Sequence, residues 1–425
     1  MALPDADGGW EPAGELLLSD SPLRAVLDPD VLGVVAPRAV ARWGEEVLAA
    51  VGVLRGFALV HDAEVAVDPE AADHDLDGEA EWLGVVQSEA AALAPARSGR
   101  EWEFAVPGVL PELVAVRDLD LVRPDAWPRA LELLASAPET WQAVVGPQRV
   151  VLPDGRRHDV QTYTAWWLAA HPVLAGRRPV DLRDPAGDAA LAGLWDDAPA
   201  GIDPVLARAL GVRTTLEALL AAPGGADELL DRLAEVDRPV TAAGLRELLR
   251  ALAGQEPNDV TPPTKVRIRP DRVVDAADVV VLDAPDLLAL LGAGEPLVVA
   301  SALAGPLADV LDLPLASEVV PGEVLSSGLP RAVPAVVARA LTCTPPTYFQ
   351  HKRLVVRGRC GEVEVGWRVL PGGADGPEVH AADQAGLARA LAWAAGAWDR
   401  RWLVAALLTD PARADVLLAE TELDG

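Results

Sequence analysis

The stretch 354–369 reads LVVRGRCGEVEVGWRV and contains the clearest folding signal of the chain. Apolar and polar residues alternate on both sides of residues 359–361, as they do in two strands joined by a tight turn. Alternation of this kind places every second side chain on one face of a sheet. The sequence therefore predicts a β-hairpin, in which Arg357 and Arg359 face Glu362 and Glu364 as cross-strand ion pairs.

The residues around this hairpin predict an α/β-like C-terminal region. Continuous apolar runs at 279–282 and 296–300 are bounded by turn residues, which is typical of buried strands, and a short helix is expected between them at 287–291. A last long helix begins at Asp383, a preferred N-cap residue. Its apolar stripe contains Leu387, Leu391, Ala395, Trp398 and Trp402.

The middle of the chain reads as an α+β segment followed by helices. Short strands near 113–116 and 150–160 surround a helix that opens at Trp127, which gives a β-α-β-β order. Leucines then recur at helical spacing over 203–252, with an interruption at 223–225. This pattern predicts a subdomain of three or four helices.

Residues 3–18 indicate a hairpin that leads into a strand, and 37–53 predicts a helix. Pro107 marks a soft boundary, and the polar, proline-bearing stretch 255–263 is a better linker. We therefore expect a multidomain α+β protein with mixed small sheets and one helical subdomain. The expected domains are 1–106, 107–258 and 259–425.

Composition limits the classes of partner. The chain has 425 residues, 51% of them apolar, and 65 acidic against 36 basic residues give a formal net charge of -29. So high an apolar content disfavours disorder, and the negative charge repels phosphate backbones and anionic lipids, so we expect neither nucleic acid nor a membrane as partner. Two cysteines cannot provide the disulfide bonds that would stabilise a chain of this length. This favours a reducing compartment and a cytoplasmic location.

Motifs for metal binding and catalysis are incomplete or absent. Residues 73–78 (DHDLDG) resemble the start of a calcium loop, but the closing acid is missing because the twelfth position is Gly84, so a solvated acidic turn is favoured. There is no G-x-S-x-G elbow, zinc spacing or phosphate loop. Cys343 and Cys360 are interpreted as ordinary buried or turn thiols. The sequence thus predicts no catalytic residue, no metal, no cofactor and no enzyme activity.

Tyr163, Trp166, Trp167 and His171 form one candidate ligand pocket. Adjacent indoles offer stacking faces beside a titratable imidazole, which suits a small ligand. No acid or second histidine stands nearby at ligand spacing. A helix start that packs into the core is therefore the favoured alternative.

A candidate partner surface contains Lys265, Arg267, Arg269 and Trp393. The three cations alternate with apolar residues, so in a strand they would share one face and could hold a phosphate or an acidic partner. A charged edge strand that guards against aggregation is the favoured alternative. Trp393 projects away from Trp398 on the terminal helix and could anchor a partner, although burial between subdomains is the alternative that we favour.

Several phrases together resemble the downstream half of actinobacterial sacsin-like proteins. The phrases are residues 3–16 (LPDADGGWEPAGEL), 115–119 (AVRDL), 163–167 (YTAWW), 171–172 (HP) and 210–213 (LGVR). The upstream half of those proteins contains a GHKL-type ATPase domain like that of the ninety-kilodalton heat-shock chaperones. The resemblance spans most of this chain, but its phrases are not catalytic motifs.

The resemblance implies a non-catalytic binding or regulatory module. The family's ATPase needs an acid-and-asparagine helix, a D-x-G-x-G turn and a glycine-rich lid, and none of these is present here. No nucleotide-binding residue is therefore carried over to this chain. The implied partner is a GHKL-type ATPase domain or protein, with a second copy of the chain as the other possibility. The alternative function is a small-molecule enzyme whose pocket uses Trp166, Trp167 and His171.

Overall fold

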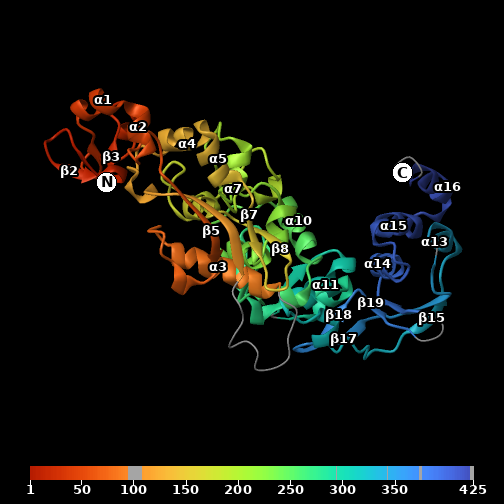
Figure 1. Cartoon of the computed structure of the whole chain (residues 1–425). Helices are drawn as coiled ribbons and strands as arrows, with labels where there is room; N and C mark the ends of the chain where they lie inside the picture. Colours follow the sequence, from red (N-terminus) through yellow and green to blue (C-terminus); the bar gives the residue numbers. More distant parts are fainter. Residues whose placement is uncertain (94–107, 293, 342, 373–375, 422–425) are drawn as a thin grey trace. The chain divides into compact units, whose positions relative to one another are not determined.

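The computed structural model describes residues 1–93, 108–292, 294–341, 343–372 and 376–421. It shows the predicted multidomain α+β fold, with several small sheets and with helices along the whole chain (Figure 1). The chain divides into two compact units, Met1–Ala218 and Leu219–Gly425. Among the described residues, no helix combines the length and the apolar character needed to cross a membrane.

The first unit begins with two small sheets and two short helices. Their elements are β1 (Ala2–Pro4), β2 (Trp10–Pro12), β3 (Leu16–Leu17), β4 (Gly33–Val34), α1 (Pro37–Trp43) and α2 (Glu45–Ala50). Strands β1 and β2 pair in antiparallel fashion, which confirms the predicted hairpin. The single helix expected at 37–53 is broken because Gly44 has a φ of 78°, a conformation that glycine adopts readily.

A four-stranded antiparallel sheet organises the rest of this unit. Its strands, in spatial order, are β5 (Leu59–Ala66), β6 (Val109–Val116), β7 (Gln148–Val151) and β8 (Arg157–Val160). The accompanying helices are α3 (Glu79–Ala92), α4 (Trp127–Ser136), α5 (Pro138–Val145) and α6 (Tyr163–Ala170). The run from β6 to β8 follows the predicted β-α-β-β order, except that two helices, α4 and α5, lie where one was expected. The boundary expected between residues 106 and 107 lies outside the described residues, and the strands on either side of it, β5 and β6, pair with each other.

Four helices cover the leucine-rich region, as predicted. They are α7 (Pro204–Ala209), α8 (Leu216–Ala221), α9 (Gly225–Ala234) and α10 (Ala242–Leu252). The boundary expected between residues 258 and 259 lies inside the second unit. There Thr261 donates hydrogen bonds from its backbone N and its Oγ1 to the Asp227 carboxylate, at 2.8 and 3.0 Å. The expected linker thus packs against α9.

The second unit contains the predicted strands and the predicted hairpin. Its first elements are β11 (Lys265–Arg269), β12 (Arg272–Asp275), β13 (Val279–Leu282), the 3-10 helix η10 (Pro285–Leu290), β14 (Glu295–Val298), α11 (Ser301–Leu311) and α12 (Ala316–Val319). The hairpin consists of β17 (Leu354–Gly358) and β18 (Gly361–Val365), joined by the two residues between Gly358 and Gly361. Arg353 pairs with Glu364 at 2.6 Å, but Arg357 pairs with Glu323 at 2.9 Å and not with the facing hairpin strand.

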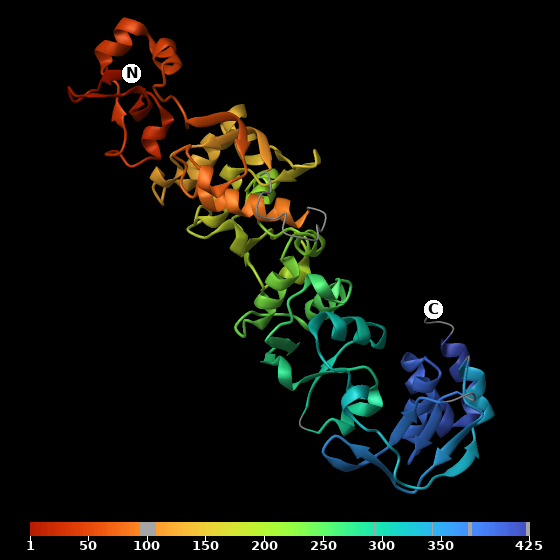
Figure 2. The same ribbon diagram turned by 60° about the horizontal axis from the view of Figure 1, so that its bottom comes forward.

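A second four-stranded sheet carries the C-terminal helices on one face (Figures 1 and 2). Its strands, in spatial order, are β15 (Leu329–Ala332), β16 (Thr347–Gln350), β20 (Glu378–Ala381) and β19 (Trp367–Leu370). The helices are α13 (Ala335–Ala340), α14 (Gln384–Ala394), α15 (Arg401–Thr409) and α16 (Ala414–Thr421). The expected long helix is wrong beyond Ala394, because Gly396 has a φ of 67° and ends it. Trp402 therefore leaves the expected stripe and is 63% exposed.

The position of Arg267 contradicts part of the expected partner surface. Strand β11 keeps a regular register from Lys265 to Arg267, but α9 packs against it, so Arg267 is only 2% exposed. Its guanidinium donates to three carbonyl oxygens: that of Leu233 at 2.9 Å, that of Pro270 at 2.5 Å and that of Glu235. Two of these belong to the C-terminal end of α9, where the helix dipole favours a cation. Arg267 therefore joins β11 to α9 and is not available to a partner.

We predict that Arg267→Met destabilises the protein, because it leaves buried carbonyl oxygens at the end of α9 without a donor. The expected loss in the free energy of unfolding is about 2 kcal/mol, measured by urea denaturation. Lys265→Met, on the exposed end of the same strand, is the matched control and should change stability by less than about 0.5 kcal/mol. Equal effects of the two substitutions would show that the buried guanidinium is not a structural cap.

Candidate functional site

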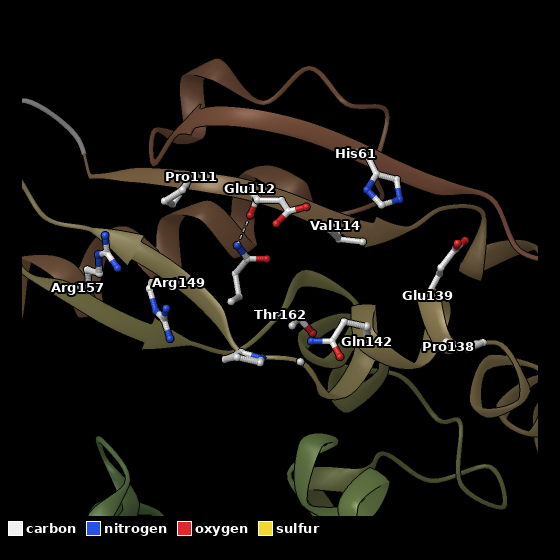
Figure 3. A pocket seen from close by; sticks show the side chains of 13 residues that line it. His61, Pro111, Glu112, Val114, Pro138, Glu139, Gln142, Arg149, Arg157 and Thr162 are labelled. Atoms are coloured by element: carbon white, nitrogen blue, oxygen red, sulfur yellow. Dashed lines mark hydrogen bonds between the residues drawn. The ribbon is translucent and has the colours of Figure 1, made fainter.

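An open groove of about 680 Å³ lies beside the sheet of the first unit, and Figure 3 shows the side chains that line it. We call it the β6–α5 groove. Its lining comes from β5, β6, β7, β8, α5 and the residue that precedes α6. A volume of this size lies within the usual range for ligand sites.

The groove exists because β7 leaves β6. Within the described residues the two strands are paired at one position, Val109 opposite Val151. Further along, the side chain of Gln148 crosses the gap, and its Nε2 donates to the carbonyl oxygen of Glu112 at 2.5 Å (Figure 3). A side-chain amide thus stands where a backbone bond of the sheet would otherwise be.

Pro111 gives a physical reason for the separation. It lies in β6 between the paired position and Glu112, and proline has no N–H to donate to a neighbouring strand. Opposite it on β5, Glu64 has a φ of 59°, and the β5–β6 ladder is interrupted between Ala63 and Val65. The irregularity re-aims the backbone groups of β6, as strand bulges do.

The groove side of β6 presents backbone groups without a strand beside them. On the β5 side, the N–H of Arg117 donates to the carbonyl oxygen of Ala58 at 3.0 Å, which fixes the alternation of hydrogen-bonded pairs. On the groove side, the N–H of Val116 donates to Thr164 Oγ1 at 3.0 Å. By the same alternation, Val114 directs both its N–H and its carbonyl oxygen toward the groove and α5. These two groups are therefore suited to bind an extended backbone.

Charged side chains mark the two ends of the groove. Arg149 and Arg157 lie together on β7 and β8, whereas Glu139 and His61 lie toward the opposite end (Figure 3). Arg149 also pairs with Asp159 at 2.9 Å. The site is thus basic at one end and carries a carboxylate at the other, with Val114, Gln142 and the Glu112 carboxylate between them (Figure 3).

The predicted aromatic group is brought together, but outside the residues that line this groove. Tyr163 and Trp167 are buried, and the ring of His171 stacks on Trp167 with ring centres 3.6 Å apart. Nδ1 of His171 lies 2.7 Å from the carbonyl oxygen of Trp167, and Trp167 Nε1 donates to Asp77 Oδ2 at 2.8 Å. Trp166 is half-buried, with its ring centre 6.2 Å from that of Tyr163. These contacts match the alternative in which the aromatic group packs into the core.

The acidic turn 73–78 supplies the partners of these aromatic residues. Tyr163 OH donates to the carbonyl oxygen of Asp77 at 2.7 Å, and burial, reinforced by nearby carboxylates, raises the pKa of Tyr163. The described residues contain no group of three or more His, Cys, Asp or Glu side chains arranged to hold a metal ion. No local pattern predicts the docking of this turn onto α6, because the two segments are far apart in the chain.

His74 fixes the same turn to β5 and α3. Its Nδ1 lies 2.5 Å from Glu79 Oε1 and its Nε2 lies 3.0 Å from Asp62 Oδ2. Burial lowers the pKa of His74, but the hydrogen bonds to Glu79 and Asp62 outweigh burial and raise the pKa above its ordinary value of 6.5. The imidazolium is therefore the form that holds the two carboxylates.

The remaining candidates lie on separate elements of the second unit. Lys265 and Arg269 are exposed at the two ends of β11. Trp393 is half-buried on α14 and packs edge-on against Trp398, with ring centres 6.0 Å apart. Cys343 and Cys360 are both exposed and free, so the buried alternative for these thiols is wrong.

We predict that His74→Gln destabilises the protein more in mild acid than in base. The pKa of His74 is raised by folding, so its contribution is complete below about pH 6.5 and is lost as the pH rises through the folded pKa. The difference in the free energy of unfolding should be on the order of 1 kcal/mol at pH 5.5 and close to zero at pH 9. Urea denaturation measures it, with His158→Gln as control. A difference that does not change with pH would exclude a charged His74.

Comparison with protein-family models, with curated proteins and with solved structures finds no match to this chain. The resemblance to sacsin-like proteins therefore stays a prediction from the sequence. The functional proposal depends on the chemistry of the β6–α5 groove.

Proposed function

We propose that this chain is a non-catalytic binding module whose β6–α5 groove accepts an extended polypeptide segment of a partner. One observation carries the proposal: among the described residues β7 pairs with β6 only at Val109, so the alternation of β6 turns the N–H and the carbonyl oxygen of Val114 toward an open groove. Exposed strand edges bind extended peptides by adding a strand, with main-chain hydrogen bonds providing affinity. The groove would accept a short segment in this way.

The neighbours of Val114 define the length of the site. On one side Gln148 occupies the carbonyl oxygen of Glu112, and on the other Thr164 occupies the N–H of Val116. An incoming strand would therefore form its pair of main-chain bonds at Val114, with α5 on its other side. Such a short ladder is weak alone, so side-chain contacts must contribute to affinity.

The charged ends of the groove set the direction of the bound segment. Arg149 and Arg157 favour an acidic side chain at one end, and Glu139 favours a basic one at the other. A segment with an acid and a base separated by a few apolar residues satisfies both ends. Electrostatic complementarity of this kind fixes register and orientation more than it adds affinity.

A chaperone-type ATPase, as a domain or as a separate protein, is the partner that we propose for the module. This choice of partner rests on the sequence phrases that resemble sacsin-like proteins and on the absence of nucleotide-binding motifs from the sequence. The bound segment would then belong to the ATPase or to a protein that it handles.

We predict that the chain itself binds no ATP, because no phosphate-binding motif occurs in its sequence. Isothermal titration with ATP and magnesium should give no binding heat. A dissociation constant in the micromolar range would contradict the proposed division of roles between this module and an ATPase.

We predict that peptides selected from a random dodecapeptide phage library on the full chain bind at the groove. Val114→Pro removes the N–H that faces the groove but no bond to β5, and it should weaken peptide binding about tenfold, as measured by fluorescence anisotropy. Arg157→Glu and Glu139→Lys reverse the charges at the two ends and should each weaken binding several-fold.

Arg129→Glu on the exposed face of α4 is the control for a change of charge, and it should leave binding unchanged. The two charge reversals also cover the case in which Val114→Pro fails to fold. If selected peptides bind all groove variants as tightly as the natural chain, or if the selection yields no binding peptide, the proposed function is wrong.

A further inference from the structure

The second unit contains a buried pair of histidines. His351 follows β16 and is 2% exposed, and His380 lies in β20 and is 5% exposed. Nε2 of His351 lies 3.0 Å from Nδ1 of His380. A side chain on Gly328 would come within 2.5 Å of His351 Nε2, so the backbone at Gly328 packs closely against the imidazole.

Polar groups extend this pair in both directions. Ser326 Oγ lies 3.0 Å from Nδ1 of His351, and Glu378 Oε1 lies 2.9 Å from Nε2 of His380. The last contact has the distance of an ion pair without the alignment of a hydrogen bond. When both imidazoles are neutral, the hydroxyl donates to His351 and His351 donates to His380, so every proton points toward Glu378.

The histidine pair connects the β17–β18 hairpin to the sheet. Residues 322–326 run beside β17, where the N–H of Leu325 donates to the carbonyl oxygen of Val355 at 2.9 Å. The next bond is made by a side chain, because the N–H of Val355 donates to Ser326 Oγ at 3.0 Å. Ser326 thus contacts the hairpin and His351 at once, while the N–H of His351 donates to the carbonyl oxygen of Ala381 in β20 at 2.8 Å.

The surroundings disfavour positive charge on the pair. Phe349 stacks on His380 with ring centres 5.1 Å apart, and Arg368 lies directly opposite His380 on β19. Arg368 is itself held by Asp286 at 2.5 Å, so that carboxylate is already occupied. Glu378 is the one acid that faces the pair among the contacts described for it. Burial lowers the pKa of both histidines below 6.5, and for His380 burial and the neighbouring cations outweigh Glu378.

We propose that the histidine pair is a proton-operated switch that releases the β17–β18 hairpin from the sheet in mild acid. One proton can be accommodated: His380 becomes charged beside Glu378, the hydrogen bonds reverse, and His351 donates from Nδ1 to Ser326. A second proton places two donors and two positive charges 3.0 Å apart, and the contact must open. The switch lies in the second unit and does not depend on the proposed groove function.

The sign of the pH dependence follows from the direction of the pKa shifts. Both folded pKa values are lowered, so the unfolded chain binds more protons, and the stabilising contribution is fully present above about pH 6.5. It is lost as the pH falls through the folded values. His74 in the first unit contributes with the opposite sign, so the test needs a readout confined to the hairpin.

Hydrogen exchange of the hairpin peptide 354–365, measured by mass spectrometry on the full chain, provides that readout. After correction for the intrinsic effect of pH, we expect exchange to be about tenfold faster at pH 5 than at pH 7.5. The double substitution His351→Gln with His380→Asn cannot take up a proton and should keep its protection at pH 5. His158→Gln, in the first unit, should behave as the natural chain does.

Protection that is unchanged between pH 7.5 and pH 5 in the natural chain would overturn the proposal, as would equal acid sensitivity in the double variant. If that variant does not fold, NMR titration of the histidine ring protons in the natural chain decides. We expect both buried histidines to titrate below pH 6.5, together with a change in the hairpin amides. Titration without any change in the hairpin would also overturn it.

Discussion

The backbone N–H and C=O groups of strand β6 need hydrogen-bond partners on both sides of the strand, and the neighbouring strands provide them on one side far more than on the other. On one side β5 pairs along most of the strand, whereas on the other side β7 is paired only at Val109 among the described residues. Two side chains, Gln148 and Thr164, serve the backbone on either side of Val114. An unpaired strand edge can pair with a strand of another chain. In β6 the open edge is short and adjoins Pro111, and both features limit aggregation through this edge. The groove is thus a consequence of how the sheet is built.

Much of the fold could be predicted because local signals agree with the tertiary environment. The hairpin 354–365 combines alternation with a two-residue turn, and its register follows from those features alone. The leucine spacing over 203–252 likewise predicts three or four helices, and four form with buried leucines. Gly44 and Gly396 both ended helices earlier than apolar spacing indicated, because a positive φ at one glycine outweighs continued periodicity.

The candidate site was missed because no local pattern encodes it. His61, Glu112, Glu139 and Arg157 are ordinary surface residues from four different elements, and only tertiary structure gathers them. Pro111, beside Glu112 in a mostly apolar strand, was the one signal that could have pointed there. Arg267 was misplaced for a related reason: α9 covers the strand face that alternation alone would leave exposed, and the Arg267 guanidinium is buried against the end of that helix. Predictions from spacing fail where a distant element covers a face that the local pattern leaves open.

The most direct test of the account is the amide exchange of β6, resolved by residue with NMR on the full chain. The N–H groups of Leu113 and Ala115 should be protected by β5, and that of Val116 by Thr164. The N–H of Val114 should exchange much faster than these three and become protected when a selected peptide binds. Protection of Val114 equal to that of its neighbours in the free chain would contradict the open strand edge on which the proposed function depends.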